Sequence, residues 1–519
     1  MRLRAKATTK LAIFLLASLT QGIGNAQVNR IRVSAASPFA ACDIKLLAGE
    51  TNYLNAEVEP RLAVSPRNPN NLVGVWQQDR FSSAGGSRGL VTGVSHDGGQ
   101  TWARNFPPLS SCAGGNAQNH GKYERATDPW VTIAPNGVIY QIALSYDAVA
   151  SAREAVLVSR SIDGGYDWSE PQPLILDTDP TVGDDKQSIT ADPYDAGFVY
   201  AVWDRTVTDS TLANTLAGPT WFSRTTNGGN SWEPARILFD PGPDAQTISN
   251  QIVVLPNGNL VNLFVRILHV NEGSTGPGDV VNMVSISRDK GMTWSAPILV
   301  ATAPSIGVVD PKTGDALRTG DSVPDIGVDR RTGALYVVWQ DARFSGGKRE
   351  GISLSRSSDG GLSWSAPIQV NRVPAVQAHT ASVDVADDGA VGVTYYDFRK
   401  DTADPRVFLS DYWEALSHDG GHTWQERHLA GSFDMLTAPK DDGGLFLGDY
   451  QSLRHWGESF LPFFVATNSG NLKNRTDVFL SMSEEEEGLD HPHEEVNAHP
   501  QSMAERLKAH RGHKRLAEK

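Results

Sequence analysis

The sequence predicts an all-β protein, a β-propeller built from four-stranded antiparallel blades, and three observations lead to this prediction. A short turn motif that ends in Trp recurs six times at intervals of 60 to 70 residues. Short strand-like segments precede and follow each copy, and helical periodicity is nearly absent before residue 483. With 519 residues, the chain is long enough for two to four ordinary domains or for one large repeat architecture, and the repeat favours the second.

Composition narrows the class of protein further. The chain has 49 Gly, 13 Trp and two Cys, and its formal net charge is −14. It is too apolar and too aromatic for a disordered chain, and it has too few cysteines for a disulfide scaffold. A basic nucleic-acid footprint is absent, so we expect no nucleic-acid partner.

The first 26 residues have the three-part pattern of a secretory signal peptide. Residues 1–10 carry four basic residues and no acid, residues 11–19 (LAIFLLASL) are apolar, and small residues at 24–26 precede Gln27. The apolar run is too short to span a bilayer, and no later run is longer. We therefore expect a secreted or periplasmic product without a membrane span. Cys42 and Cys112 would pair in such a compartment or remain as two free thiols.

The repeated motif has the chemistry of a hairpin turn. In the first copy, Asp97 is followed by Gly98 and Gly99, which supply the positive φ angles that a tight turn needs. Each copy follows a short alternating strand, and we expect it to join the third and fourth strands of a blade. The copies lie at residues 95–102, 161–168, 225–232, 287–294, 357–364 and 417–424.

The strand pattern predicts a propeller over residues 27–482. Six blades carry the motif. A seventh, without it, is expected over residues 450–482, where residues 28–34 would supply the fourth strand and close the ring. Seven blades are favoured over six. Residues 483–519 form a charged, His-containing tail, for which a mobile segment is favoured over a metal site. No cofactor or metal is predicted.

Strand order indicates where function should lie. The start of the first strand and the end of the second strand lie on one face of each blade. The six repeated turns, which we call the Asp motifs, lie on the other face. Asp and Arg recur at the strand-2 ends and are expected to bridge neighbouring blades. Residues that break the repeat are the better functional candidates: Arg61, Gln251, Arg266, His379 and Tyr450.

The motif Ser-x-Asp-x-Gly-x-Thr-Trp resembles the Asp-box, or BNR repeat, of the sialidase (neuraminidase) superfamily over roughly residues 57–482. The resemblance implies a propeller and an exo-α-sialidase, which releases terminal sialic acid. Sialidases use a Tyr nucleophile, since a neutral phenol approaches the anionic sugar without repulsion. A Glu accepts the phenol proton, an Asp protonates the leaving group, and three Arg bind the substrate carboxylate.

Individual residues match the family unevenly. Tyr450 in YQSL resembles the nucleophile, and Asp79 lies where the family has its acid. Gln251 stands where the family has Glu; an amide cannot accept the proton, so Asp449 or Asp325 would have to fill that role. The resemblance assigns the Arg positions to Arg61, Arg266, and either Arg399 or Arg343.

Two functions of different class follow from these patterns. The first is a secreted sialidase-like glycoside hydrolase, or another carbohydrate-active propeller such as a polysaccharide lyase with Tyr450 and His379 as base and acid. The second is a non-catalytic propeller that binds a glycan or a protein. Gln251 favours the second, whereas Tyr450 and the Arg-rich face favour the first. The oligomeric state stays open.

Overall fold

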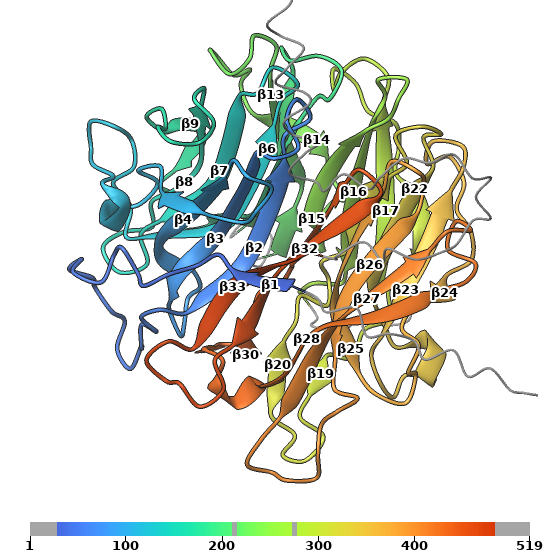
Figure 1. Cartoon of the computed structure of the whole chain (residues 1–519). Coiled ribbons are helices and arrows are strands. Elements are labelled where there is room, and N and C mark those ends of the chain that lie inside the picture. Colours follow the sequence, from blue (N-terminus) through green and yellow to red (C-terminus); the bar gives the residue numbers. More distant parts are fainter. Residues whose placement is uncertain (1–28, 210–214, 272–277, 483–519) are drawn as a thin grey trace, which may run out of the picture. The chain divides into compact units, whose positions relative to one another are not determined.

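The computed structural model describes residues 29–482 except for 210–214 and 272–277 (Figure 1). The predicted signal peptide and tail lie outside the described residues. Strands take up 49% of the chain and helix 2%, which confirms the all-β class. In the described part of the chain, no helix is long and apolar enough to cross a membrane.

The strands pair into four-stranded antiparallel units that follow one another along the chain. The units with an Asp motif are β2 (Glu57–Val64), β3 (Leu72–Arg80), β4 (Ser87–Ser95) and β5 (Ala103–Asn105); β6 (Arg125–Ile133), β7 (Ile139–Tyr146), β8 (Glu154–Ser161) and β9 (Gln172–Asp177); β10 (Val182–Ala191), β11 (Val199–Asp209), β13 (Thr220–Thr225) and β14 (Arg236–Phe239); β15 (Ala245–Val254), β16 (Leu260–Leu268), β17 (Val280–Ser287) and β18 (Ile298–Thr302); β21 (Asp325–Val328), β22 (Leu335–Asp341), β23 (Gly351–Ser357) and β24 (Ile368–Gln369); and β25 (Ala378–Val385), β26 (Val391–Asp397), β27 (Leu409–Ser417) and β28 (Gln425–Asp434).

The last unit joins the two ends of the described chain. It comprises β31 (Ser452–Trp456), β32 (Ser459–Thr467), β33 (Thr476–Met482) and β1 (Asn29–Arg32). The register pairs Ile31 with Leu480, and Arg32 forms an ion pair of 2.7 Å with Asp477. The expected pairing of the segment near residue 28 with this unit is confirmed.

The first strands of the units form a closed ring. Contacts run from β2 to β6, β10, β15, β21, β25 and β31 in turn, and β31 contacts β2 again. The core lies between the units: Val73 and Val75 of one unit pack with Val131 and Ile139 of the next. Burying each such side chain contributes about 1.5 to 3 kcal/mol, so the ring is held together by its interfaces.

The Asp motifs lie in the turns after the third strands. In the first copy, Asp97 accepts hydrogen bonds from Ser95 Oγ (2.7 Å) and from the Thr101 backbone N–H (2.9 Å), and these bonds close the turn. Gly98 N donates to Asn70 O (3.0 Å) in the turn between the first two strands. The motifs therefore share a face with the turns between strands 1 and 2, as the strand order predicts.

Two insertions add a small sheet to the ring. Residues 303–324 carry β19 (Val308–Val309) and β20 (Ala316–Arg318), and residues 435–449 carry β29 (Lys440–Asp441) and β30 (Gly444–Phe446). They pair in the order β19-β20-β30-β29, with β20 and β30 parallel (Figure 1). We call these four strands the insert sheet. The remaining elements are β12 (Thr215–Gly218) and the 3-10 helices η1 (Ser111–Ala113), η3 (Arg343–Ser345) and η4 (Met435–Thr437).

Candidate functional site at the ring axis

Bulges near the starts of the ring strands carry the charged residues of the site. Glu59 in β2, Asp128 in β6 and Lys186 in β10 have φ angles of 54°, 50° and 47°, and the pairing register shifts at each of them. Side chains other than Gly rarely adopt a positive φ, and bulges re-aim side chains away from the regular alternation. Ser249 and Thr380 occupy the same place in β15 and β25.

The three charged bulge residues meet Asp449, which precedes β31. Lys186 Nζ lies 2.7 Å from Asp128 Oδ1, 2.7 Å from Asp449 Oδ2 and 3.4 Å from Glu59 Oε1. We call Glu59, Asp128, Lys186 and Asp449 the axial cluster. None of the four is more than 9% exposed, so their charges interact without much screening by water.

The protonation of the cluster is uneven. Burial raises the pKa of Glu59 to about 7, although Lys186 opposes the shift. Burial also acts to raise the pKa of Asp449, but the charges of Lys186 and Arg318 outweigh it and hold that pKa well below its usual range. Burial acts to lower the pKa of Lys186, but the surrounding carboxylates raise it by more. The pKa therefore lies well above its usual value, and this ammonium stays charged.

The insert sheet closes this end of the ring. Arg318 of β20 binds Asp449 through Nε (2.9 Å) and Asp441 through a terminal nitrogen (2.8 Å). Arg80 at the end of β3 reaches the same Asp441 oxygen (3.2 Å). A Cβ added to Gly320 would lie 2.0 Å from Asp449 O, so the insertion lies directly against the cluster. Beneath it is a cavity of about 10 Å³ that Asp128, Lys186, Gln251 and Tyr450 line, which is room for about one water.

Several predicted residues surround this cavity. Tyr450 OH donates to Pro129 O (3.2 Å), and its ring lies 5.5 Å from that of Trp130. Burial and the nearby Glu59 and Asp128 carboxylates raise the pKa of Tyr450 well above its usual value. Gln251 Nε2 donates to Pro324 O (2.8 Å). The phenol is thus neutral, and Gln251 is engaged with the backbone.

Arg61 and Asp325 form a buried pair beside the same residues. Arg61 contacts Asp325 (3.2 Å), donates to Gln451 O (3.2 Å) and lies over the Trp130 ring, 3.6 Å from its centroid. Asp325 also accepts from Ser382 Oγ (2.5 Å) and the Val383 N–H (3.1 Å), which ties β21 to β25. Both predicted residues therefore lie near the ring axis, but their charges are already paired with each other.

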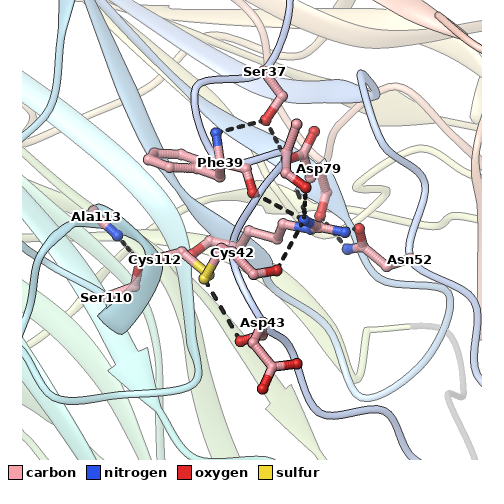
Figure 2. The surroundings of a disulfide bond; sticks show 11 residues. Ser37, Phe39, Cys42, Asp43, Asn52, Asp79, Ser110, Cys112 and Ala113 are labelled. Carbon is pink, nitrogen blue, oxygen red and sulfur yellow. Dashed lines mark hydrogen bonds and ion pairs between the residues drawn. A yellow bond between two sulfur atoms is a disulfide. The ribbon is translucent and has the colours of Figure 1, made fainter.

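Asp79 does not face the cavity. Its carboxylate accepts from Ser37 Oγ (2.5 Å) and from the Asn55 N–H (2.8 Å) in the segment that precedes β2. Figure 2 shows this carboxylate between Ser37 and Asn52, beside the disulfide that joins Cys42 to Cys112. The predicted acid holds the N-terminal segment onto the ring.

Among the remaining predicted residues, His379, Arg343 and Arg399 have structural partners, whereas the buried Nε of Arg266 has no hydrogen-bond partner among the described residues. His379 is stacked between Tyr396 and Phe398, with both centroid distances 5.3 Å, and burial lowers its pKa to about 3. Arg343 pairs with Asp341 (2.6 Å) and Arg399 with Asp397 (2.5 Å), each within its own unit. Arg266 lies opposite Thr247 in β15, half-buried. These two pairs lie within units, whereas Arg205 of β11 bridges to Asp177 of β9 in the preceding unit (2.6 Å), so the Asp–Arg pairs support the architecture in both ways.

Of the cluster residues, only Asp449 was assigned a role from the sequence, as a possible proton acceptor in place of Gln251; Glu59, Asp128 and Lys186 were not assigned one. Glu59, Asp128, Lys186 and Asp449 meet because of bulges that no local sequence rule gives. The signal in the sequence is that two acidic residues and a Lys occupy equivalent positions in three successive units, where β15 and β25 have Ser249 and Thr380.

The other end of the axis is open. A cavity of about 360 Å³ begins beyond the bulges and is lined by later residues of the ring strands, among them Ala63, Val131, Ile189 and Ile326. Its lining ends at the turns between strands 1 and 2, including Pro69, Pro193, Arg330 and Gly457. It therefore opens on the face of the Asp motifs. The sequence pointed to the opposite face, which the cluster and the insert sheet close.

Comparisons with known proteins bear on the fold. No family model and no curated protein matches the chain. Solved structures with a partly similar backbone include the Hadza microbial sialidase Hz136 (14% identity, TM-score 0.44, covering 78% of this chain and 73% of that one). They also include an α-L-arabinanase from Penicillium chrysogenum (13%, 0.42, 69% and 93%) and a NanB sialidase from Streptococcus pneumoniae (13%, 0.39, 83% and 68%). At these identities and TM-scores, none of these likenesses assigns an activity.

Proposed function

We propose that this protein is a glycan-cleaving enzyme, a glycoside hydrolase whose reacting groups are the axial cluster and Tyr450. One observation carries the proposal: two carboxylates on the same ammonium have pKa values pushed in opposite directions. Glu59 keeps a proton near neutral pH, whereas Asp449 stays ionised. Such a division is how an acid and an anion work side by side at one pH.

The spacing of the two carboxylates favours retention of configuration. Glu59 Oε1 lies 3.4 Å and Asp449 Oδ2 lies 2.7 Å from Lys186 Nζ. These two oxygens can be no further apart than the sum of those distances, which is below the separation of about 6.5 Å at which inverting hydrolases begin. A water between the two groups does not fit, so a covalent intermediate is the route that the geometry supports.

Within this class, our finer proposal is an exo-α-sialidase type of reaction on a terminal acidic sugar. Tyr450 would be the nucleophile, and Asp449, which stays ionised and whose charge acts on Tyr450, would take the phenol proton in place of Gln251. Glu59 would give its proton to the leaving group. Arg61 would release Asp325 and bind the substrate carboxylate in its place. A terminal sugar would enter when the insert sheet swings away from Asp449, as lids do in many enzymes.

A specific observation favours a second function, a non-catalytic propeller that binds a glycan or a protein. Every member of the cluster is buried and paired, and structural ion networks also shift pKa values. In that case the cluster only ties the ring strands together. A lyase that uses His379 is not proposed, because Tyr396 and Phe398 enclose that ring.

Hydrolysis assays separate these functions. The full chain is incubated with an α-sialoside reporter, an α-L-arabinofuranoside reporter and a panel of acidic polysaccharides, beside Glu59→Gln, Tyr450→Phe and Asp449→Asn. Loss of turnover by about 10²-fold or more in Glu59→Gln supports the proposal. The matched control is Glu154→Gln, since burial raises the pKa of Glu154 to about 8 in a different cluster.

Each outcome decides one point. Turnover of the sialoside that survives Tyr450→Phe overturns the nucleophile assignment. Inversion of configuration at the anomeric carbon, detected by NMR, overturns the covalent route. An absence of turnover on every substrate, with retained glycan binding, establishes the second function instead.

We also propose the finer architecture and location. The ring contacts, with β1 completing the last unit, support a seven-bladed propeller. The pattern of residues 1–26 supports export. The partner that we propose is a glycan or glycoconjugate. The Cys42–Cys112 disulfide is what an oxidising compartment permits. A crystal structure tests the number of blades, and N-terminal sequencing of the exported product tests the export.

A further inference from the structure

The open cavity on the Asp-motif face has the features of a second binding site, although its inner end shares Trp130 and Gln251 with the small cavity at the cluster. At its level, each ring strand pairs only with the second strand of its own unit, as Val131 does with Gln141 and Val253 with Val261. The other edge of each strand faces the axis. Some of its backbone groups are bonded by neighbouring side chains, as Ile252 O is by Thr190 Oγ1 and Ala191 N–H is by Thr132 Oγ1, and the remaining ones are presented to the cavity. Such a wall suits a ligand that carries several hydroxyl groups.

The lining carries three arginines and two aspartates, so positive charge is in excess. Arg61 lies at the inner end, where its buried Nε has no hydrogen-bond partner among the described residues. Arg454 donates from Nε to Leu62 O (3.1 Å) and from a terminal nitrogen to Leu453 O (2.9 Å). Arg330 is exposed at the mouth, and no described residue bonds to it. Free guanidinium donors favour a carboxylate or another anion.

A histidine held by a carboxylate stands beside these arginines. Asp384 Oδ2 accepts from the His455 backbone N–H and lies 2.8 Å from Nδ1 of the same residue. This contact fixes the tautomer with the proton on Nδ1, so Nε2 is left as an acceptor. Nε2 lies 3.7 Å from Asp387 Oδ1, beyond hydrogen-bond distance.

We propose that this cavity binds a small hydroxylated carboxylate, of the chemical class of a sugar acid. The carboxylate would bind Arg330 and Arg454, and a hydroxyl would donate to His455 Nε2. A volume of about 360 Å³ is within the range of cavities that hold small ligands and takes one sugar residue. The site differs from the axial cluster and does not rest on the proposed hydrolase activity.

Calorimetric titration of the full chain with glucuronate tests the proposal. We expect one saturable site per chain and no heat from glucose, which lacks the carboxylate. Arg330→Gln and His455→Gln should each weaken binding by about tenfold, since each removes one charged or directional contact. Arg288→Gln is the matched control, because Arg288 is exposed on the same face in an Asp motif outside the cavity.

The remaining arms separate this site from its alternatives. Glu59→Gln should leave glucuronate binding unchanged, which distinguishes a failure here from a failure of the hydrolase proposal. Absent binding, or equal binding by wild type and Arg330→Gln, overturns the site. Inorganic phosphate that binds as tightly as glucuronate and competes with it overturns the assignment to hydroxylated carboxylates. Thermal unfolding of each variant checks that the fold is retained.

Discussion

The two ends of the ring axis are built from the same strands but differ in kind. At the strand starts, bulges bring Glu59 and Asp128 onto the Lys186 ammonium, Asp449 joins them from the segment before β31, and only about 10 Å³ is left empty under the insert sheet. Further along the same strands, the backbone is regular, the side chains are mostly small or aliphatic, and about 360 Å³ is open. The comparison teaches that a one-residue bulge in each of a few strands is enough to turn a channel into a closed charged centre.

The largest effect is expected from removing the ammonium at the closed end. Lys186→Met leaves Asp128, Asp449 and Glu59 buried without their shared counter-charge, so we expect a loss of about 3 to 5 kcal/mol in the free energy of unfolding. Urea unfolding at neutral pH measures it. Arg330→Met, the matched change at the open end, should cost no more than about 0.5 kcal/mol. Equal losses in the free energy of unfolding for Lys186→Met and Arg330→Met would contradict the difference between the closed and the open end.

The pH dependence of Glu59 gives the next effect. Its folded pKa is raised from 4.5 to about 7, so its ionisation makes the folded protein less stable as pH rises through this window. Relative to wild type, Glu59→Gln should therefore gain stability between about pH 5 and 7, by at most about 1.4 kcal/mol per pH unit. Thermal unfolding across this range tests it, and a constant difference would mean that Glu59 is ionised throughout.

His379 should act in the opposite direction at the same end. Its folded pKa of about 3 lies below the unfolded value of 6.5, so stability is full above pH 6.5 and is lost as pH falls. His379→Phe keeps a ring between Tyr396 and Phe398 and should flatten the acid side of the stability profile between about pH 6 and 4. A profile that stays as steep as that of wild type would contradict a buried neutral imidazole.

The smallest effect is expected at the open end. Thr190 Oγ1 donates to Ile252 O (2.7 Å) and so joins β10 to β15 beside the cavity. Thr190→Val removes this one neutral hydrogen bond, and we expect a cost of about 0.5 to 1.5 kcal/mol in urea unfolding. A cost above about 3 kcal/mol would show that the open end is held as tightly as the closed one.

The difference between the ends also explains how much the sequence could predict. Gly98, Gly99 and Trp102 recur at a fixed period, and local turn chemistry placed them between the third and fourth strands. The strand that completes the last unit was also predictable, because residues 28–34 alternate and the other units need four strands. These features depend on short-range pattern, which the sequence shows directly.

The site depends on features that short-range pattern does not contain. Nothing near Lys186 in the sequence indicates a positive φ, and nothing in residues 303–324 or 435–449 indicates that they meet over Asp449. Tyr450 and Arg61 were placed near the axis by resemblance, and the structure puts them there but engages them with Pro129 O and Asp325. Asp79 was assigned by its position in the resemblance and His379 because it breaks the repeat, and their partners come from segments that only the tertiary fold brings together.

The pairing of β1 with β33 sets an order on how the protein can be made. The strand at Asn29–Arg32 leaves the ribosome hundreds of residues before Thr476–Met482, so its hydrogen-bonding edge has no partner during most of synthesis. Ser34 and Arg32 likewise wait for Asp477. A chain that stops short of residue 476 would carry an open sheet edge on both sides of the gap, exposed to proteases and to other chains. The ring can thus close only after residues 476–482 have been made.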